Sequence, residues 1–326
     1  MSFNLGLADL ESAAEVVHSI MSPTPQHNWP LLSERTGADV WVKHENHTPI
    51  GAFKVRGGLV YMQDLAKREP NCPGVITATR GNHGQSVALA ATRVGIKSTI
   101  LLPRGNSVEK NAAMRAFGGD LVEHGDDFQE AYERAHQMAG ESGLHMLDSF
   151  HPLLISGVGT YGLEFFRACP DLDAVFVPVG LGSGICGVMT ARDALGLKTK
   201  IYGVVSENAA AYALSFEQGK PVSTNSANTM ADGMACRVPV APAVEMINKG
   251  AEGIVQVSDP EIKSAMRAYF TDTHNIAEGA GAAPLAALIK MRQELAGKKV
   301  GLILSGGNVD RDVYQAILQE VDEPES

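Results

Sequence analysis

The chain has 326 residues, 44% of them hydrophobic and 20% charged, which is enough for about two globular domains with a buried core. A formal net charge of −10 argues against a nucleic-acid-binding protein, because such proteins need a basic surface, although a local site can still bind a small anion. No segment reaches the roughly 18 consecutive apolar residues of a membrane span, and the N-terminus has no signal-peptide pattern, so neither a membrane nor a nucleic acid is expected as a partner.

Short apolar strands alternate with helices from about residue 39 onward. In the first half we expect a strand over 38–45, a helix over 57–68, a strand over 74–79, a helix over 84–95, a strand over 97–103, a helix over 108–119, a strand over 120–125 and a helix over 127–143. In the second half we expect a helix over 160–169, a strand over 173–180, a helix over 185–196, strands over 200–206 and 253–258, helices over 259–275 and 279–297, and a strand over 298–307. Asn106 or Ser107 is expected to cap the helix over 108–119, and Asp259 the helix that begins beside it.

This alternation predicts an α/β fold with mostly parallel, twisted sheets that carry helices on both faces. Ligands of such folds bind at the carboxyl ends of the strands, where loops lead into helices. Four cysteines lie far apart and form no CxxC pair, so they predict neither a disulfide framework nor a zinc site. We therefore expect reduced cysteines in a cytoplasmic protein.

The stretch GAFKVRGG, residues 51–58, places Lys54 directly after an aromatic residue and among small ones. A lysine held in a dry site loses its proton more easily, because burial disfavours the charged form. The neutral amine can then form a Schiff base with an aldehyde. Phe53 could support or cover a planar ring.

A second loop, within TATRGNHGQSVALAA (residues 77–91), lies between a strand and a helix. Thr79, Asn82 and the loop amides can bind a carboxylate at the helix N-terminus. Asn82 can instead donate to a ring hydroxyl, or merely cap the helix. His83 alone is more typical of a structural hydrogen-bonding residue than of a catalyst.

A third loop, VPVGLGSGICGV (residues 177–188), follows an apolar strand and opens a helix, and its glycines leave backbone N–H groups free for a phosphate. A tight turn without a ligand is the alternative. The loop also contains Gly182-x-Gly184-x-x-Gly187, with Glu207 20 residues further on. That spacing matches a dinucleotide fingerprint and makes an NAD-dependent oxidoreductase a rival, but it leaves Lys54 and Asn82 without a function.

A fourth stretch, GLILSGGNVD (residues 301–310), places Ser305 at the end of an apolar strand before two glycines. Such a serine can hydrogen-bond a heteroatom of a bound ring, and a plain strand-to-loop turn is the alternative. A phosphate cradle, a partner for a ring nitrogen, a carboxylate-binding loop and a buried lysine together describe a site for pyridoxal 5'-phosphate and an amino acid.

The chain resembles the tryptophan-synthase-β type (fold type II) of pyridoxal-phosphate enzymes, and within it the threonine/serine dehydratase and serine racemase family. The segments AFKVRGG, TRGNHGQ, GLGSG and LSGGN are similar to the family's SFKxRGA, SSGNHGQ, GGGGL and LSGGN, in the same order and over nearly the whole chain. The resemblance implies two domains, each with a mostly parallel sheet. Residues 1–52 and 150–326 would form a large cofactor-binding domain, and residues 53–149 a small substrate-binding domain.

The resemblance also implies roles for individual residues. Lys54 would be the catalytic Schiff-base lysine, with Phe53 packed on the pyridine ring and Asn82 bonded to the ring 3-hydroxyl. The residues implied for the phosphate are Gly180, Leu181, Gly182, Ser183 and Gly184, and the residue implied for the pyridine nitrogen is Ser305. The residues implied for the substrate carboxylate are Thr79, Asn82 and His83.

Several positions depart from the family pattern. Arg80 replaces the serine that serves racemases as an acid, and because a guanidinium is a poor proton donor, racemisation is not expected to be the main activity. Arg80 is instead expected to pair with an anionic group of the substrate or to turn toward the protein, and both alternatives stay open. Ser206 and Tyr212 stand where a racemase-like metal site would need carboxylates, so no metal is expected. A C-terminal regulatory domain is not expected either.

These observations predict a dehydratase, or ammonia-lyase, that eliminates water from a β-hydroxy amino acid to give a 2-oxo acid and ammonia. By family the substrate would be threonine or serine, while Arg80 raises hydroxyaspartate or phenylserine. An amino acid racemase, an NAD-dependent oxidoreductase and a non-catalytic amino-acid sensor are the alternatives. Since dimers are usual in the family, a homodimer is expected.

Overall fold

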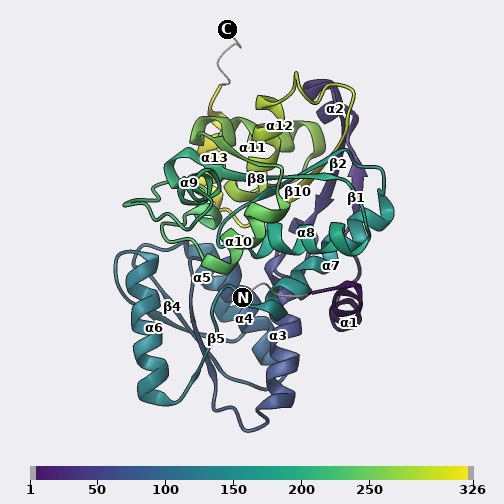
Figure 1. The fold of residues 1–326 in the computed structure, drawn as a ribbon. Helices are drawn as coiled ribbons and strands as arrows, with labels where there is room; N and C mark the ends of the chain where they lie inside the picture. Colours follow the sequence, from purple (N-terminus) through teal and green to yellow (C-terminus); the bar gives the residue numbers. More distant parts are fainter. Residues whose placement is uncertain (1–4, 322–326) are drawn as a thin grey trace.

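The computed structural model describes residues 5–321 and contains two β-sheets surrounded by helices (Figure 1). The larger sheet has six strands in the order β1-β2-β10-β7-β8-β9, with β1 antiparallel to β2 and the other neighbours parallel. Its strands are β1 (Gln26–Asn28), β2 (Asp39–His44), β7 (Ala174–Pro178), β8 (Lys200–Ser206), β9 (Gly253–Val257) and β10 (Lys299–Leu304).

The smaller sheet has four strands in the order β5-β4-β3-β6, and all of its pairs are parallel. Its strands are β3 (Val75–Ala78), β4 (Ser98–Leu102), β5 (Gly119–Glu123) and β6 (His145–Met146). The predicted α/β class with mostly parallel sheets is therefore confirmed.

Helices cover both faces of the smaller sheet, because successive apolar side chains of a strand point to opposite faces. The helices are α4 (Asn82–Arg93), α5 (Val108–Ala116) and α6 (Phe128–Ser142). In β4, Ile100 and Leu102 pack with α4 and α5, whereas Leu101 packs with α6 on the other face.

The larger sheet is buried on both faces in the same way. Leu302 and Leu304 of β10 belong to one apolar cluster and Ile303 to the other. The helices around this sheet are α2 (Pro30–Thr36), α7 (Pro152–Ala168), α8 (Ser183–Ala194), α9 (Ala211–Gln218), α10 (Ala241–Gly250), α11 (Asp259–Thr273), α12 (Gly279–Lys290) and α13 (Arg311–Gln319). Short 3₁₀ turns add η1 (Glu45–His47), η2 (Glu207–Ala209) and η3 (Asp232–Met234). No helix within residues 5–321 is long and apolar enough to cross a bilayer.

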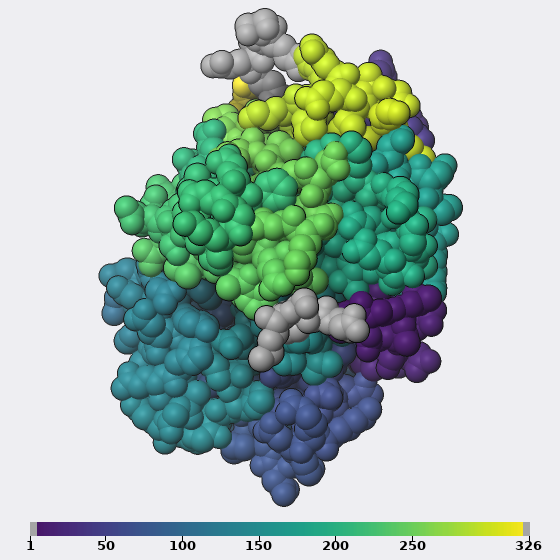
Figure 2. Space-filling view, in the orientation of Figure 1, coloured from purple at the N-terminus to yellow at the C-terminus, as the bar shows by residue number. Residues whose placement is uncertain are grey.

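Helix α3 (Lys54–Arg68) lies where the two parts of the chain meet, and it packs on α4 and on α7. Helix α1 (Leu7–His18) packs on α3 and α7. In the space-filling view, blue-to-teal residues form the lower half, and the upper half combines teal, green and yellow residues from later in the sequence with part of the purple N-terminal region (Figure 2). The division at residues 52/53 and 149/150 stays a prediction.

Helix α7 is longer than the sequence predicts, since it begins at Pro152 and not near residue 160. The helix contains three glycines, at residues 157, 159 and 162, although glycine is a poor helix former. The structure explains their presence by close packing. A Cβ at Gly157 would lie 2.6 Å from the carbonyl oxygen of Arg56 and 2.7 Å from Cα of Gly57, so only glycine lets α7 approach α3 this closely.

Several helix ends also differ from expectation. Helices α3 and α4 begin at Lys54 and Asn82, so both predicted site residues occupy a first helical turn. Ser107 caps α5 as predicted, by accepting a hydrogen bond from the backbone of Lys110. Asp259 was the wrong cap for α11, because the capping box is formed by Ser258 with Glu261.

Candidate active site

All side chains and loops predicted to contact a cofactor or substrate line one cavity of about 440 Å³. They are Phe53, Lys54, Thr79, Arg80, Asn82, His83, Gly180, Leu181, Gly182, Ser183, Gly184 and Ser305. A larger cavity of about 580 Å³ lies beside α5 and α13, contains none of them and shares only Lys110 with the first. The smaller cavity is the candidate active site, because it gathers the nucleophile, the glycine loop and several buried charged groups. The role of each residue stays a prediction.

Lys54 is the first residue of α3, and its amine faces the cavity. The Nζ atom donates to Oγ of Ser183 over 3.3 Å and lies 5.1 Å from the ring centre of Phe53. Although the side chain borders open cavity, the surrounding protein removes water from the amine, and this burial lowers its pKa to about 8. No carboxylate of residues 5–321 lies within ion-pair distance of Nζ, so the amine is available as a nucleophile or base.

The glycine loop between β7 and α8 forms a cradle for an anion. Gly182 has φ of +96°, a conformation that other L-residues rarely adopt, and a Cβ at Gly180 would clash with the carbonyl oxygen of Gly233. The loop therefore stays free of side chains at these two positions. The first N–H groups of α8, which begins at Ser183, have no partner within the helix and favour a phosphate at this end.

Two buried tyrosines hold this loop from behind. The hydroxyl of Tyr212 donates to the carbonyl of Leu181 over 3.0 Å and accepts from the backbone N–H of Val240 over 3.1 Å. The hydroxyl of Tyr161 donates to the carbonyl of Gly184 over 3.3 Å. Tyr212 thus supports the loop at a position where a metal site would need a carboxylate. Across residues 5–321 no three His, Cys, Asp or Glu side chains are placed to hold a metal ion.

Apart from Arg80, the loop before α4 offers polar but uncharged groups. Oγ1 of Thr79 accepts from the backbone N–H of Gly81 over 2.9 Å, which fixes the turn. Burial, and then the nearby Lys54 charge, lower the pKa of His83 to about 3, so its ring is neutral at physiological pH. Its Nε2 atom has no hydrogen-bond partner among the described residues, which leaves it available to a ligand.

Ser305 follows the last residue of β10 and is buried at the cavity wall. Its backbone carbonyl accepts from the N–H of Phe53 over 3.0 Å. The end of the central strand therefore fixes the turn that carries Lys54 and also brings the Ser305 side chain to the same cavity.

Two arginines line the cavity and differ in their surroundings. Arg80 is exposed, and no hydrogen bond or ion pair joins it to another described residue. Arg237, from the loop before α10, pairs with Asp127, the N-cap residue of α6, at 3.2 Å. Arg80 therefore places an uncompensated positive charge at the cavity wall.

Three further charged residues line the cavity, and the sequence motifs do not predict them as site residues. Glu278 precedes α12, Lys110 lies on α5 and Asp232 begins η3, and Nζ of Lys110 is 2.5 Å from Asp232 and 3.5 Å from Glu278. The segment EGAGAAPLAAL, residues 278–288, is similar to the family pattern. No local pattern indicates that Glu278 faces the cavity that contains Lys54. Only the tertiary arrangement brings these three segments together.

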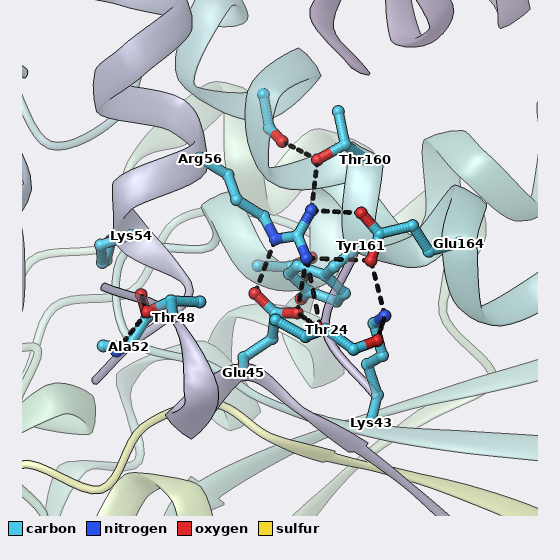
Figure 3. Close-up of polar contacts among 12 residues, drawn as sticks. Thr24, Lys43, Glu45, Thr48, Ala52, Lys54, Arg56, Thr160, Tyr161 and Glu164 are labelled. Atoms are coloured by element: carbon cyan, nitrogen blue, oxygen red, sulfur yellow. Dashed lines mark hydrogen bonds and ion pairs between the residues drawn. The ribbon is translucent and has the colours of Figure 1, made fainter. Parts of the chain in front are cut away.

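A buried ion cluster anchors the first turn of α3 (Figure 3). Arg56 donates to Glu45 from Nε over 2.7 Å and to Glu164 from Nη1 over 2.6 Å, and Lys43 donates to Glu164 over 2.6 Å. Arg56, Glu45 and Lys43 are fully buried. In Figure 3 Arg56 extends from α3 toward these carboxylates, whereas Lys54 lies on the other side of the turn, as expected for residues two positions apart on a helix.

The dinucleotide interpretation of the glycine loop is not supported by this geometry. Glu207, its proposed ribose partner, is exposed at the start of η2 and is not among the residues that line the cavity. Lys54 and Asn82 instead face the loop across the cavity.

A buried reactive lysine opposite an anion-binding glycine loop, in an α/β fold, defines the site of a cofactor-dependent enzyme. The chain belongs to the pyridoxal-phosphate dependent enzyme family, whose model matches residues 17–306, and the resemblance seen in the motifs is confirmed. The L-threonine ammonia-lyase of Thermotoga maritima is 34% identical over 315 residues, which cover 96% of this chain and 78% of that protein.

Solved structures agree in fold. The processed threonine deaminase isoform 2 of Solanum lycopersicum has a TM-score of 0.88 and 31% identity, over 98% of this chain and 96% of that chain. A pyridoxal 5'-phosphate-dependent aspartate racemase has a TM-score of 0.90 and 28% identity, over 96% and 98%. The cofactor of this enzyme is accordingly pyridoxal phosphate, and the glycine cradle, the lysine without a carboxylate partner and the buried Ser305 fit its phosphate, aldehyde and ring.

Proposed function

We propose that this enzyme is an ammonia-lyase that converts a β-hydroxy amino acid, threonine or serine in type, into a 2-oxo acid and ammonia. The observation that carries the proposal is the convergence of Lys54, the glycine loop, Asn82 and Ser305 on one cavity. The threonine-specific names of its relatives at 34% and 31% identity support the substrate class.

The chain's own groups divide the work of binding. The N-terminus of α8 and the loop from Gly180 to Gly184 hold the phosphate, and the Ser305 hydroxyl bonds the ring nitrogen. Because a serine hydroxyl is neutral, it does not force a proton onto that nitrogen. Thr79, His83 and the amides at the start of α4 bind the substrate carboxylate through hydrogen bonds, since His83 is uncharged.

Pyridoxal phosphate, when bound, supplies an aldehyde that condenses with amines and an electron-poor ring that withdraws charge from the substrate Cα. In the absence of substrate, Lys54 Nζ would hold the cofactor through its aldehyde. The released amine, with its pKa lowered to about 8 by burial, is then partly neutral near physiological pH and takes the proton from Cα. The β-hydroxyl leaves with a proton as water, and hydrolysis of the resulting unsaturated amine gives the 2-oxo acid and ammonia.

The substitution Lys54→Ala tests this proposal. We expect loss of 2-oxo acid formation from threonine and serine, and loss of the long-wavelength absorbance of the lysine-bound cofactor. Lys220→Ala, at an exposed lysine outside the cavity, is the matched control. Turnover by the Lys54→Ala enzyme at the rate of the control would contradict the mechanism. An untreated protein that binds NAD and lacks cofactor absorbance would support the oxidoreductase instead.

We further propose that Arg80 widens or changes the choice of β-substituent, toward hydroxyaspartate or another bulky or polar group such as that of phenylserine. Its support is the exposed guanidinium at the cavity wall, for which the described residues offer no partner. The measurement is kcat/KM of the Arg80→Ser enzyme for threonine, serine, hydroxyaspartate and phenylserine. A fall confined to hydroxyaspartate assigns a carboxylate to Arg80, and unchanged ratios remove Arg80 from substrate choice. Chiral analysis of residual substrate measures racemase activity, which a guanidinium at position 80 does not favour.

We also propose a cytoplasmic homodimer. None of the four cysteines forms a disulfide within residues 5–321, and α11, α13 and the segment before α12 each carry an exposed apolar side chain, namely Phe270, Val313 and Ile276. Sedimentation equilibrium of the holoenzyme tests the dimer, and a monomer at micromolar concentration would contradict it.

A further inference from the structure

The side-chain amide of Asn82 is held in one orientation by groups at both ends of a hydrogen-bond chain. The carbonyl of Ile50 can only accept, so the atom of Asn308 that contacts it over 2.8 Å is the nitrogen. That nitrogen also donates over 2.8 Å to Oδ1 of Asn82. Nδ2 of Asn82 therefore points the other way and donates to Oε1 of Glu278 over 2.7 Å.

Asn82 consequently keeps one N–H for the cavity. Its Nδ2 atom carries two hydrogens, and Glu278 is the one acceptor that the described residues give it. If the Asn82 amide were reversed, its oxygen would face the Glu278 carboxyl, and its nitrogen would face the Asn308 nitrogen, which would lose its acceptor. Glu278 and Asn308 together thus determine that the cavity meets an N–H of Asn82 and not its oxygen.

Glu278 itself is an unusual neighbour for a cofactor ring. It is buried, and its Oε2 atom accepts no hydrogen bond among residues 5–321. The charged groups that face it are Lys110 from α5, at 3.5 Å, and Asp232 from η3, which holds the same lysine more closely at 2.5 Å. One positive charge is therefore shared by two carboxyl groups.

Burial, which the shared Lys110 offsets only in part, keeps the Glu278 carboxyl from ionising fully at physiological pH. Burial raises its pKa, Lys110 opposes that rise and Asp232 adds to it, and the result is a pKa of about 7. In its neutral form Glu278 still accepts from Asn82 but places no negative charge beside it.

We propose that Glu278 is a positioning residue for the cofactor ring, which aims an N–H of Asn82 at the ring oxygen and keeps an uncharged carboxyl behind it. The inference rests on the proposed contact between Asn82 and the ring. The electron-rich ring oxygen then faces an N–H donor. An ionised Glu278, on the far side of the same amide, would repel that oxygen because both carry negative charge. Glu278 acts through Asn82, and Lys110 and Asp232 tune it.

The test measures binding of pyridoxal phosphate to the apoenzyme and needs no turnover. We expect Glu278→Ala to raise the dissociation constant of pyridoxal phosphate by about tenfold, because Asn82 loses an acceptor that helps to orient it. Glu278→Gln keeps an acceptor oxygen but cannot ionise. Near pH 6 its dissociation constant for pyridoxal phosphate should match that of wild type within about threefold. Near pH 8 it should be lower than that of wild type, because wild-type Glu278 is then ionised. The ratio of wild type to Glu278→Gln cancels the titration of the cofactor itself.

The direction of a second shift separates this role from a merely structural one. In Asp232→Asn, Lys110 pairs with Glu278 alone, and this lowers the pKa of Glu278. The pH above which cofactor binding weakens should therefore be lower than in wild type. Glu207→Gln, at an exposed carboxylate outside the cavity, should leave the pH profile unchanged.

The proposal would be overturned if the ratio of the wild-type and Glu278→Gln dissociation constants stayed constant from about pH 5.5 to 8.5. It would also be overturned if binding to Asp232→Asn weakened only at a higher pH than in wild type. If Glu278→Ala does not fold, the Gln and Asn variants still decide. Because cofactor binding is the readout, an incorrect substrate assignment leaves the result intact, while failure of Lys54→Ala to lose activity would concern the proposed function alone.

Discussion

Arg56 satisfies its charge entirely inside the protein, between Glu45 and Glu164. Removing one partner of a buried ion pair leaves an uncompensated charge, which costs about 3–5 kcal/mol. We therefore expect Arg56→Met to lower the free energy of unfolding by that amount, measured by urea denaturation of the apoenzyme.

The matched control for Arg56 is Arg167, whose pair with Glu11 is half-exposed at both ends. Exposed pairs contribute about 0–1 kcal/mol, so Arg167→Met should leave stability nearly unchanged. Equal losses in the two variants would show that the buried cluster gives no special support to the lysine helix.

For individual residues, the sequence predicts the groups of the candidate site better than the charged residues that surround them. Short motifs identify Lys54, Asn82 and Ser305, because the residue types and the flanking glycines carry the signal within a few positions. Glu278 carries no such signal, since its meaning comes from Lys110 and Asp232, which lie far away in the chain and approach only after folding.

Among the elements, α7 owes its place to small residues. We expect Gly157→Ala to destabilise the protein by about 1–3 kcal/mol, because a methyl group there would overlap backbone atoms of α3, which cannot move as a side chain can. Gly140→Ala, inside α6 and facing open space, should instead stabilise by about 0.5–1 kcal/mol through helix propensity.

Thermal unfolding of both glycine variants measures this contrast, and stabilisation by Gly157→Ala would contradict the packing explanation. The same contrast explains why the start of α7 was missed. Glycine lowers helix propensity wherever it stands, and sequence alone does not distinguish a glycine that breaks a helix from one that lets two helices approach.

For the whole molecule, the cofactor site joins segments that accompany different sheets. Lys54 and the loop before α4 lie with the smaller sheet, and the glycine loop and Ser305 belong to the larger one. We expect removal of pyridoxal phosphate to lower the free energy of unfolding by about 2.7 kcal/mol relative to enzyme with cofactor at ~100-fold its dissociation constant.

Calorimetry with and without added cofactor measures this loss. Pyridoxal, which lacks the phosphate, should restore little of it, because the N-terminus of α8 then has no anion to bind. Full recovery with pyridoxal would contradict the assignment of the glycine loop. Sequence patterns predict the alternation that builds both sheets, but not the order of their strands, which depends on contacts between distant segments.

A Cβ at Gly180 would lie 2.3 Å from the carbonyl oxygen of Gly233, so the cradle for the cofactor and the segment around Gly233 pack closely and form one wall of the cavity. Anyone who redesigns this enzyme for a larger substrate would meet that wall first. Room cannot be added at residues 180 and 233, because glycine has no side chain to remove, and a side chain at residue 180 would collide with the Gly233 carbonyl. The freedom to evolve new substrates therefore lies further out, at residues 225–228 and at Arg80, which border the same cavity without bracing the cradle.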